Sequence, residues 1–294
     1  MAINAMILVF ILVVMTFSAY AMWDSNQIYR SADAVQYDIY RPKQGETASF
    51  EEFKAENPEV IAWLSVYGTN IDYPITQTDN NHKYVTTDAF GNYALSGAIF
   101  LDYKNDKDFT NFNNILYGHH MDKDAMFGEI GSFEDKSFFN DHAYGNLFYE
   151  GRDYGLEFFA FIDDTDAYNA TIFTANVKKK SNQQKYLDEI FASAVNTRSI
   201  NVTIKDRILL LSTCDSAMTN GRDILIARIS DQTYTDPFAE ERTISVVDRL
   251  KEIPLWGRVL MPVILLLLIT LVILTKSRNN KKEGKEDNEG IHTK

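Results

Sequence analysis

The chain has 294 residues, of which 45% are apolar and 13% aromatic, enough for a packed core and too apolar for a disordered tail. A formal net charge of −12 argues against nucleic acid and anionic lipid as binding partners, although solubility alone would also explain it. The single cysteine excludes an internal disulfide.

Two charge-free apolar segments, residues 3–22 and 259–275, predict membrane spans near the two ends of the chain. Residues 1–22 are interpreted as an N-terminal anchor, or as a cleaved signal peptide, because Ala19-Tyr20-Ala21 resembles a cleavage site. The tail, residues 276–294, opens with a basic cluster that marks the cytoplasmic side: Lys276, Arg278, Lys281 and Lys282. Both termini are then cytoplasmic, and the segment between the spans lies outside the cell membrane.

Residues 23–60 carry helical patterns, DSNQIYRSADAVQYDIYR and SFEEFKAENPEVIAWL, the second with Ser49 as the expected N-cap. Residues 61–235 are mainly β and form the central domain, and residues 236–258 form a juxtamembrane linker. Turn residues separate the expected strands, which are VYGTNIDYPI, SGAIFLD, NNILYGHH, NLFYEGRDYGLEFFAFI, ATIFTANV, NVTIKD, RILLLSTC and RDILIARIS. This pattern predicts a β-barrel or sandwich.

One helical insert interrupts the strands, in a long crossover over roughly residues 163–197. Its sequence is NQQKYLDEIFASAV, and its expected apolar face consists of Tyr186, Ile190, Phe191 and Val195.

Cys214 follows the strand-like run RILLLST and precedes a polar segment, DSAMTNG. A thiol at such a strand end can be held by rigid backbone and still face a substrate. It can equally be a small buried hydrophobe. A reactive thiol needs a histidine or cation beside it, because little thiolate exists at the ordinary pKa of cysteine.

His119 stands at the end of another expected strand, directly after Gly118. The pair of His119 and His120 also allows a metal site, with Asp122, Asp124 or His142 as further ligands. Adjacent residues of an extended segment point to opposite faces, however, and no usual zinc-ligand spacing is present. The sequence therefore favours His119 as the thiol's partner and predicts no metal.

Arg222 opens the last expected strand, after the seven-residue segment that follows Cys214. Such an arginine can pair with a surface carboxylate. If its strand and that of Cys214 are hairpin neighbours, its guanidinium lies beside the thiol and can hold a developing oxyanion. Arg228 lies on the same strand face about 20 Å farther along and is the weaker candidate.

Four motifs of this chain resemble those of the class B sortases in order and spacing. They are SGAIFLD, NNILYGHHMDKDAMFGEI, NVTIKDRILLLSTC and NGRDILIARI. The likeness extends from about Asp24 to Ser230. The family's TLxTC motif has Leu210 in place of its threonine. The resemblance implies a closed eight-stranded β-barrel with N-terminal helices and one crossover helix, and it assigns residues 61–235 to the catalytic domain.

The resemblance further implies a cysteine transpeptidase with Cys214 as nucleophile, His119 as general acid and base, and Arg222 as the oxyanion-holding group. It implies an LPxTG-like sorting signal as substrate, cleaved after threonine through a thioacyl enzyme, and an amine acceptor from a pilin lysine or a peptidoglycan precursor. No cofactor is implied. The residues that resemble the family's signal-binding positions are Asn81, Val85, Thr165, Ser212 and Asp215.

A C-terminal membrane segment is more typical of sortases that polymerise pilins, which favours pilin polymerisation slightly over wall anchoring. Two rival functions stay open. The first is a hydrolytic cysteine endopeptidase, in which water replaces the amine. The second is a non-catalytic surface-binding domain with Cys214 buried.

Overall fold

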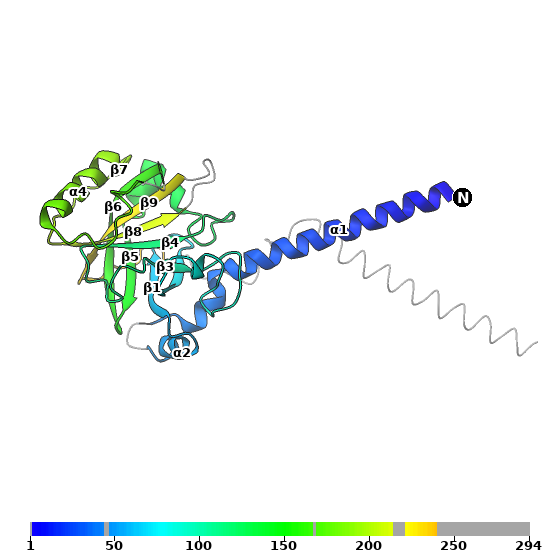
Figure 1. Cartoon of the computed structure of the whole chain (residues 1–294), viewed down its shortest axis with the longest axis horizontal. Coiled ribbons are helices and arrows are strands. Elements are labelled where there is room, and N and C mark those ends of the chain that lie inside the picture. The colour runs from blue at the N-terminus through cyan, green and yellow to red at the C-terminus, as the bar shows by residue number, and fades with distance from the viewer. Residues whose placement is uncertain (1, 44–46, 167–168, 214–220, 240–294) are drawn as a thin grey trace, which may run out of the picture. The chain divides into compact units, whose positions relative to one another are not determined.

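Short apolar runs separated by turn residues become the strands of one sheet (Figure 1). The computed structural model describes residues 2–43, 47–166, 169–213 and 221–239. The strands are β1 Val60–Val66, β2 Asp72–Thr76, β3 Ile99–Leu101, β4 Asn113–Gly118, β5 Tyr144–Tyr149, β6 Arg152–Asp166, β7 Asn196–Thr197, β8 Arg207–Thr213 and β9 Gly221–Ser230. The helices are α1 Ala2–Ala32, α2 Ala48–Glu56, α3 Lys136–Asp141 and α4 Lys180–Ser193, with short 3-10 helices η1 Ala34–Tyr40, η2 Lys83–Val85 and η3 Ile130–Glu134.

The sheet closes on itself. Its strand order is β5-β1-β2-β3-β4-β8-β9-β6-β7, and β5 also pairs with β6. Eight strands therefore complete a ring, and the two-residue β7 attaches to β6 outside it. Closure leaves those eight strands without a free edge. The prediction of a closed eight-stranded β-barrel is confirmed.

Two of the strand pairs are parallel, β2 with β3 and β4 with β8, and the others are antiparallel. Between β6 and β8 the chain makes the long crossover that contains α4, which lies beside β6 and β7 (Figure 1). The predicted crossover helix is thus confirmed. Its buried side chains are Tyr186, Leu187 and Ile190, whereas the expected apolar residues Phe191 and Val195 are exposed.

The N-terminal helices are present, but their expected boundary was wrong. α2 begins at Ala48 with Thr47 as its N-cap, so Ser49 lies inside the first turn and is not the cap. The helix ends at Glu56, because Asn57 precedes a proline and such residues disfavour the α conformation. The run VIAWL, expected to continue the helix, forms most of β1.

Two of the expected strands, ATIFTANV and NVTIKD, are irregular segments of the crossover. Ile172 is nevertheless buried, and its carbonyl accepts a hydrogen bond of 2.6 Å from the Tyr186 hydroxyl of α4. The apolar residues of these segments pack against the outside of the barrel together with α4, so they need no period-two alternation.

Residues 1–239 form one compact unit, and residues 240–294, a second unit, lie outside the described part of the chain. None of the described helices is long and apolar enough to cross a membrane, which leaves the span expected at residues 3–22 without support. The span expected at residues 259–275 lies outside the described residues.

Candidate functional site

Four adjacent strands, β4, β8, β9 and β6, present one shared outer face. Along β8, Leu209 and Leu211 belong to the main hydrophobic core, whereas Ile208 and Leu210 belong to a second cluster that also contains the buried residues of α4. β9 alternates in the same way, because Leu225 lines the main core and Ile224 packs in the second cluster. Of the described site residues, Thr165, Ser212 and Arg222 continue this outer face at one end of the barrel.

His119 directly follows β4, and its side chain is half-buried. Its Nε2 lies 2.8 Å from the carbonyl oxygen of Val85 at the end of η2. A carbonyl oxygen accepts hydrogen bonds and cannot donate them, so this contact requires the proton on Nε2. The neutral ring then has Nδ1 as its basic atom, the one able to take a proton from a thiol.

Gly118 allows the close packing that fixes the histidine segment. A Cβ at this position would lie 2.7 Å from a ring carbon of Phe127, which is fully buried. The Phe127 amide in turn donates a 3.0 Å hydrogen bond to the carbonyl oxygen of His119. The glycine that ends β4 is therefore needed for close approach, and the aromatic ring covers the backbone just before the histidine.

Arg222 lies at the start of β9, where it pairs with Thr165 of β6 across the sheet. Both side chains are partly exposed, and both belong to the outer face by their register. The charge of Arg222 also acts on the Tyr117 hydroxyl. The structure therefore brings Arg222 and Thr165 together and places Tyr117 of β4 within their electrostatic reach.

Cys214 and Asp215 lie outside the described residues. The last described residue of β8 is Thr213, which pairs with Gly118 in the parallel ladder between β4 and β8. The two strands thus end side by side, one pair before His119.

Asn81 and Val85 lie on the segment that contacts His119. The Asn81 side chain makes two internal hydrogen bonds, donating to Asp102 Oδ2 at 2.9 Å and accepting from the Tyr103 amide at 3.0 Å. One amide hydrogen and one oxygen lone pair are left for a substrate. The Val85 side chain is 37% exposed, so it offers an apolar surface next to the histidine.

Ser212 is fully buried between Tyr117 of β4 and Ile224 of β9. Within the described part of the chain its Oγ has no hydrogen-bond partner. A substrate could reach this hydroxyl only if neighbouring residues moved.

Sequence reasoning missed two residues of this region, Asp102 and Tyr117. Asp102 follows β3, is 4% exposed, and accepts a hydrogen bond of 3.1 Å from the Tyr117 hydroxyl. Burial raises the pKa of Tyr117, and the neighbouring Asp102 raises it further, so the phenol stays protonated. Asp102 is the last residue of the motif SGAIFLD, but the sequence does not reveal its burial, which arises from contacts between distant segments.

The residues considered for a metal are dispersed. In the described ranges, no group of three or more His, Cys, Asp or Glu side chains is arranged to hold an ion. His142 stacks between Phe138 and Phe238, with ring centroids 3.8 Å and 4.9 Å away, and its Nδ1 donates to the Phe138 carbonyl. His120 forms an isolated backbone bridge with Met126.

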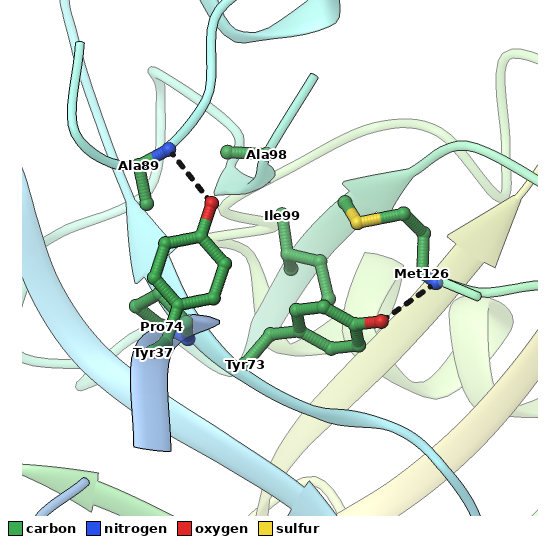
Figure 2. A pocket seen from close by; sticks show the side chains of 7 residues that line it. All are labelled: Tyr37, Tyr73, Pro74, Ala89, Ala98, Ile99 and Met126. Atoms are coloured by element: carbon green, nitrogen blue, oxygen red, sulfur yellow. Dashed lines mark hydrogen bonds between the residues drawn. The ribbon is translucent and has the colours of Figure 1, made fainter. Parts of the chain in front are cut away.

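Figure 2 shows a small pocket beside β2 and β3. The Tyr37 hydroxyl accepts from the Ala89 amide, and that of Tyr73 accepts from the Met126 amide (Figure 2). The space does not admit a water molecule, which makes it a packing feature rather than a ligand site. Its lining consists of Tyr37, Tyr73, Pro74, Ala89, Ala98, Ile99 and Met126.

No protein-family model matches the chain. Among curated proteins, sortase B of Staphylococcus aureus is 33% identical over 184 residues, which cover 61% of this chain and 74% of that protein. Two solved structures are also similar. Sortase B from the type II pilus of Streptococcus pneumoniae is 42% identical, with a TM-score of 0.55, over 62% of this chain and 99% of that one. A class B sortase of Streptococcus pyogenes, involved in pilus biogenesis, is 38% identical, with a TM-score of 0.57, over 64% of this chain and 100% of that one.

Proposed function

This chain belongs to the class B sortases, which are cysteine transpeptidases, and from that premise we propose that Cys214, His119 and Arg222 are its catalytic residues. The Cys214 thiolate attacks the carbonyl carbon of threonine in an LPxTG-like sorting signal. The peptide bond after threonine breaks, and His119 protonates the leaving amine. An amine of a second substrate then attacks the thioester and gives up a proton to His119, and the carbon–sulfur bond breaks to release the Cys214 thiolate.

The observation that carries this proposal is the register of β8 with its two neighbours. β8 runs parallel to β4, and its last described pair is Gly118 with Thr213. β8 runs antiparallel to β9, and the pair closest to the site is Ser212 with Ile224. In the sequence, His119 is one residue beyond Gly118, and Cys214 is one residue beyond Thr213 and two beyond Ser212, while Arg222 is two residues before Ile224. We therefore propose that these three side chains meet at this end of the barrel.

Arg222 is suited to the oxyanion because its donors form a fixed planar fork. Hydrogen-bond donors aimed at the developing charge stabilise the tetrahedral intermediate more than the substrate, which lowers the barrier. Thr165, paired with Arg222 across β6 and β9, lies beside the same position and is proposed to contact the signal, as are Asn81 and Val85 on the histidine side.

For the biological role, we propose pilin polymerisation ahead of wall anchoring. The support is that the similar S. pneumoniae enzyme comes from a pilus and that the S. pyogenes enzyme takes part in pilus biogenesis. The acceptor in this role is a pilin lysine, and the acidic chain, with a net charge of −12, attracts such a cation. Deletion of the gene should remove pilus ladders on a gel. If the ladders persist while a monomeric surface protein appears in the medium, the role is wall anchoring.

The proposed location is the outer face of the cell membrane, with both termini cytoplasmic. Its support is the sequence alone, namely the two apolar segments 3–22 and 259–275 and the basic residues that follow the second one. Protease added to intact protoplasts should digest the catalytic domain and spare a C-terminal tag. Digestion of the tag under the same conditions would contradict this orientation.

The reaction is tested with the full-length protein in detergent, sorting-signal peptides and triglycine as amine. Mass spectrometry should detect the peptide joined to triglycine, and Cys214→Ala should abolish it while leaving the unfolding transition unchanged. A rate of Cys214→Ala within tenfold of the parent contradicts the proposal, with tenfold corresponding to about 1.4 kcal/mol of barrier. Hydrolysis whose product and rate do not change when triglycine is added indicates an endopeptidase. No reaction together with an unalkylated Cys214 indicates a binding domain.

A further inference from the structure

Asp102 is a buried carboxylate next to the candidate site, and neither the sequence motifs nor the proposed chemistry assigns it a role. It directly follows β3, and its backbone is fixed on both sides. The amide donates to the Ile115 carbonyl of β4 at 2.9 Å, and the Gln77 side chain donates to the Asp102 carbonyl at 2.9 Å. A carboxylate held this firmly and exposed by 4% needs donors to offset its burial.

Three donors surround the carboxylate. Its Oδ1 accepts from the Lys104 amide at 2.9 Å. Its Oδ2 accepts from both the Asn81 side chain at 2.9 Å and the Tyr117 hydroxyl at 3.1 Å. The first bond is local to the turn after β3, whereas the other two join segments that are far apart in the sequence. Asp102 is thus the point where the segment containing Asn81 and the strand β4 are tied together.

Both of these segments lead to His119. Tyr117 precedes the histidine by two residues on β4. Asn81 begins the short segment that ends at Val85, whose carbonyl holds His119 Nε2 at 2.8 Å. Asp102 Oδ2 is therefore hydrogen-bonded both to Tyr117, on the strand that leads to His119, and to Asn81, on the segment whose carbonyl oxygen orients the histidine ring.

We propose that Asp102 is a positioning residue for the transpeptidation reaction, and that its carboxylate fixes the orientation of the His119 imidazole through Asn81 and Tyr117. This inference rests on the proposed function, in which His119 moves the protons. The side chain of Asp102 does not itself contact the imidazole in the described structure. The Asp102 carboxylate keeps His119 Nε2 hydrogen-bonded to the Val85 carbonyl oxygen, so that Nδ1 is the ring nitrogen that exchanges protons with the thiol and the amine.

Asp102→Asn tests the inference because the two side chains have the same shape. If the new amide keeps its oxygen on the Lys104 amide, its NH₂ group faces the Asn81 NH₂ group and disrupts that contact. If it turns over, its NH₂ group faces the Lys104 amide instead. In either orientation two hydrogen-bond donors face each other and one hydrogen bond is lost, whereas the Asp102 carboxylate accepts from all three partners. The loop bearing Asn81 should shift, and with it the carbonyl that holds the histidine.

The readouts are kcat and KM for the reaction of a sorting peptide with triglycine, together with the thermal unfolding midpoint. We expect kcat of Asp102→Asn to fall roughly 10- to 100-fold, since a misplacement of about 1 Å can cost that much, while KM changes by less than about threefold. The control is Asp106→Asn, the same substitution in the same loop. Asp106 accepts from Asn111 and contacts neither Asn81 nor Tyr117 in the described structure, so its kcat should match the parent.

A double variant, Asn81→Asp with Asp102→Asn, exchanges the amide and the carboxylate between the two positions. The new carboxylate at position 81 accepts from the amide at 102 and from the Tyr103 amide, and the Tyr117 hydroxyl can accept the remaining amide hydrogen. We expect this exchange to raise kcat above that of Asp102→Asn, because it restores the hydrogen bond between residues 81 and 102 with donor and acceptor exchanged. KM should rise, because Asn81 is proposed to contact the sorting signal. A role in stability alone predicts a lowered unfolding midpoint with kcat unchanged.

The outcomes separate the inference from the proposed function. If His119→Ala reacts as fast as the parent, the proposed function is wrong. If His119→Ala is inactive and Asp102→Asn retains the parent kcat, the inference about Asp102 is overturned and the function stands. A rise in KM with kcat unchanged also overturns it, since this assigns Asp102 to holding the substrate contact of Asn81.

Discussion

Gly118 of β4 and Thr213 of β8 form the last described pair of a parallel ladder. The two strands are separated by about ninety residues of chain, including the β5–β6 hairpin and α4, yet they end together at one edge of the barrel. Parallel pairing has this consequence because residues that leave the two strands in the same direction stay adjacent. The residue after Gly118 is His119, and the residue after Thr213 is the chain's single cysteine.

The first prediction concerns Gly118→Ala. The added Cβ meets the Phe127 ring at 2.7 Å, so the end of β4 and the ring must separate. We expect a loss of about 1–3 kcal/mol in the free energy of unfolding, as for other overpacked positions, and reduced turnover because His119 is displaced. Urea unfolding and peptide turnover measure the two effects.

Phe127→Leu supplies the control for that prediction. Combined with Gly118→Ala, the smaller side chain makes room for the new methyl group, so the double variant should be more stable than the sum of the two single losses predicts. Additive losses would show that the contact between residues 118 and 127 is not the cause.

The second prediction concerns Arg222→Lys, which keeps the positive charge and removes the planar fork of donors. We expect kcat to fall by roughly 10²- to 10³-fold, the usual cost of losing an oxyanion donor. Arg228→Lys is the matched control on the same strand and face. Arg228 pairs with Glu157 and donates to the Ile200 carbonyl, so its replacement should affect stability rather than kcat. Equal losses in the two variants would exclude a special role for Arg222.

Much of the barrel could be predicted from the sequence, because strands such as RILLLST and RDILIARI are apolar runs bounded by turn residues. The failures have a physical cause. VIAWL follows the helix after the short segment 57–59, and it becomes β1 through pairing with β2 and β5, which are encoded elsewhere in the sequence. ATIFTANV has strand-like composition, but it packs over the barrel as an irregular cover. Short apolar runs do not reveal which partner they will find.

For the candidate site, the sequence motifs identify His119 and Arg222, and the registers of β4 and β9 relative to β8 add the spatial relation between them. The hydrogen bonds of Asp102 could not be predicted, because Asn81, Asp102 and Tyr117 become neighbours only after β3 and β4 pair. The assignments of Cys214 and Asp215 stay predictions, since both residues lie outside the described ranges.

The third prediction is a pH dependence of stability at Glu129. Burial raises the pKa of this carboxyl above its ordinary value, although the Asn70 amide, 2.8 Å from Oε2, partly offsets the shift. The folded state therefore favours the protonated acid. Its contribution to stability is present at low pH and is lost as the pH rises through the raised pKa.

Glu129→Gln removes this titration while keeping an oxygen for the Asn70 amide. The variant should unfold at higher urea concentration than the parent above that pKa, and the difference should grow as the pH rises from 4.5, the ordinary pKa of this carboxyl. Urea midpoints between pH 4 and pH 7 measure it. A constant difference across this range would contradict the prediction.

The fourth prediction concerns the fully buried hydroxyl of Ser212, which has no hydrogen-bond partner among the described residues. Burying an unpaired hydroxyl costs free energy, so Ser212→Ala should raise the free energy of unfolding by about 0.5–2 kcal/mol. Ser65→Ala is the control, because the Ser65 hydroxyl donates to Asp72 at 2.7 Å and its loss should be destabilising. If Ser212 contacts the sorting signal during the reaction, the more stable variant will also have a higher KM. A stabilised variant with unchanged KM and kcat would remove Ser212 from the proposed binding residues.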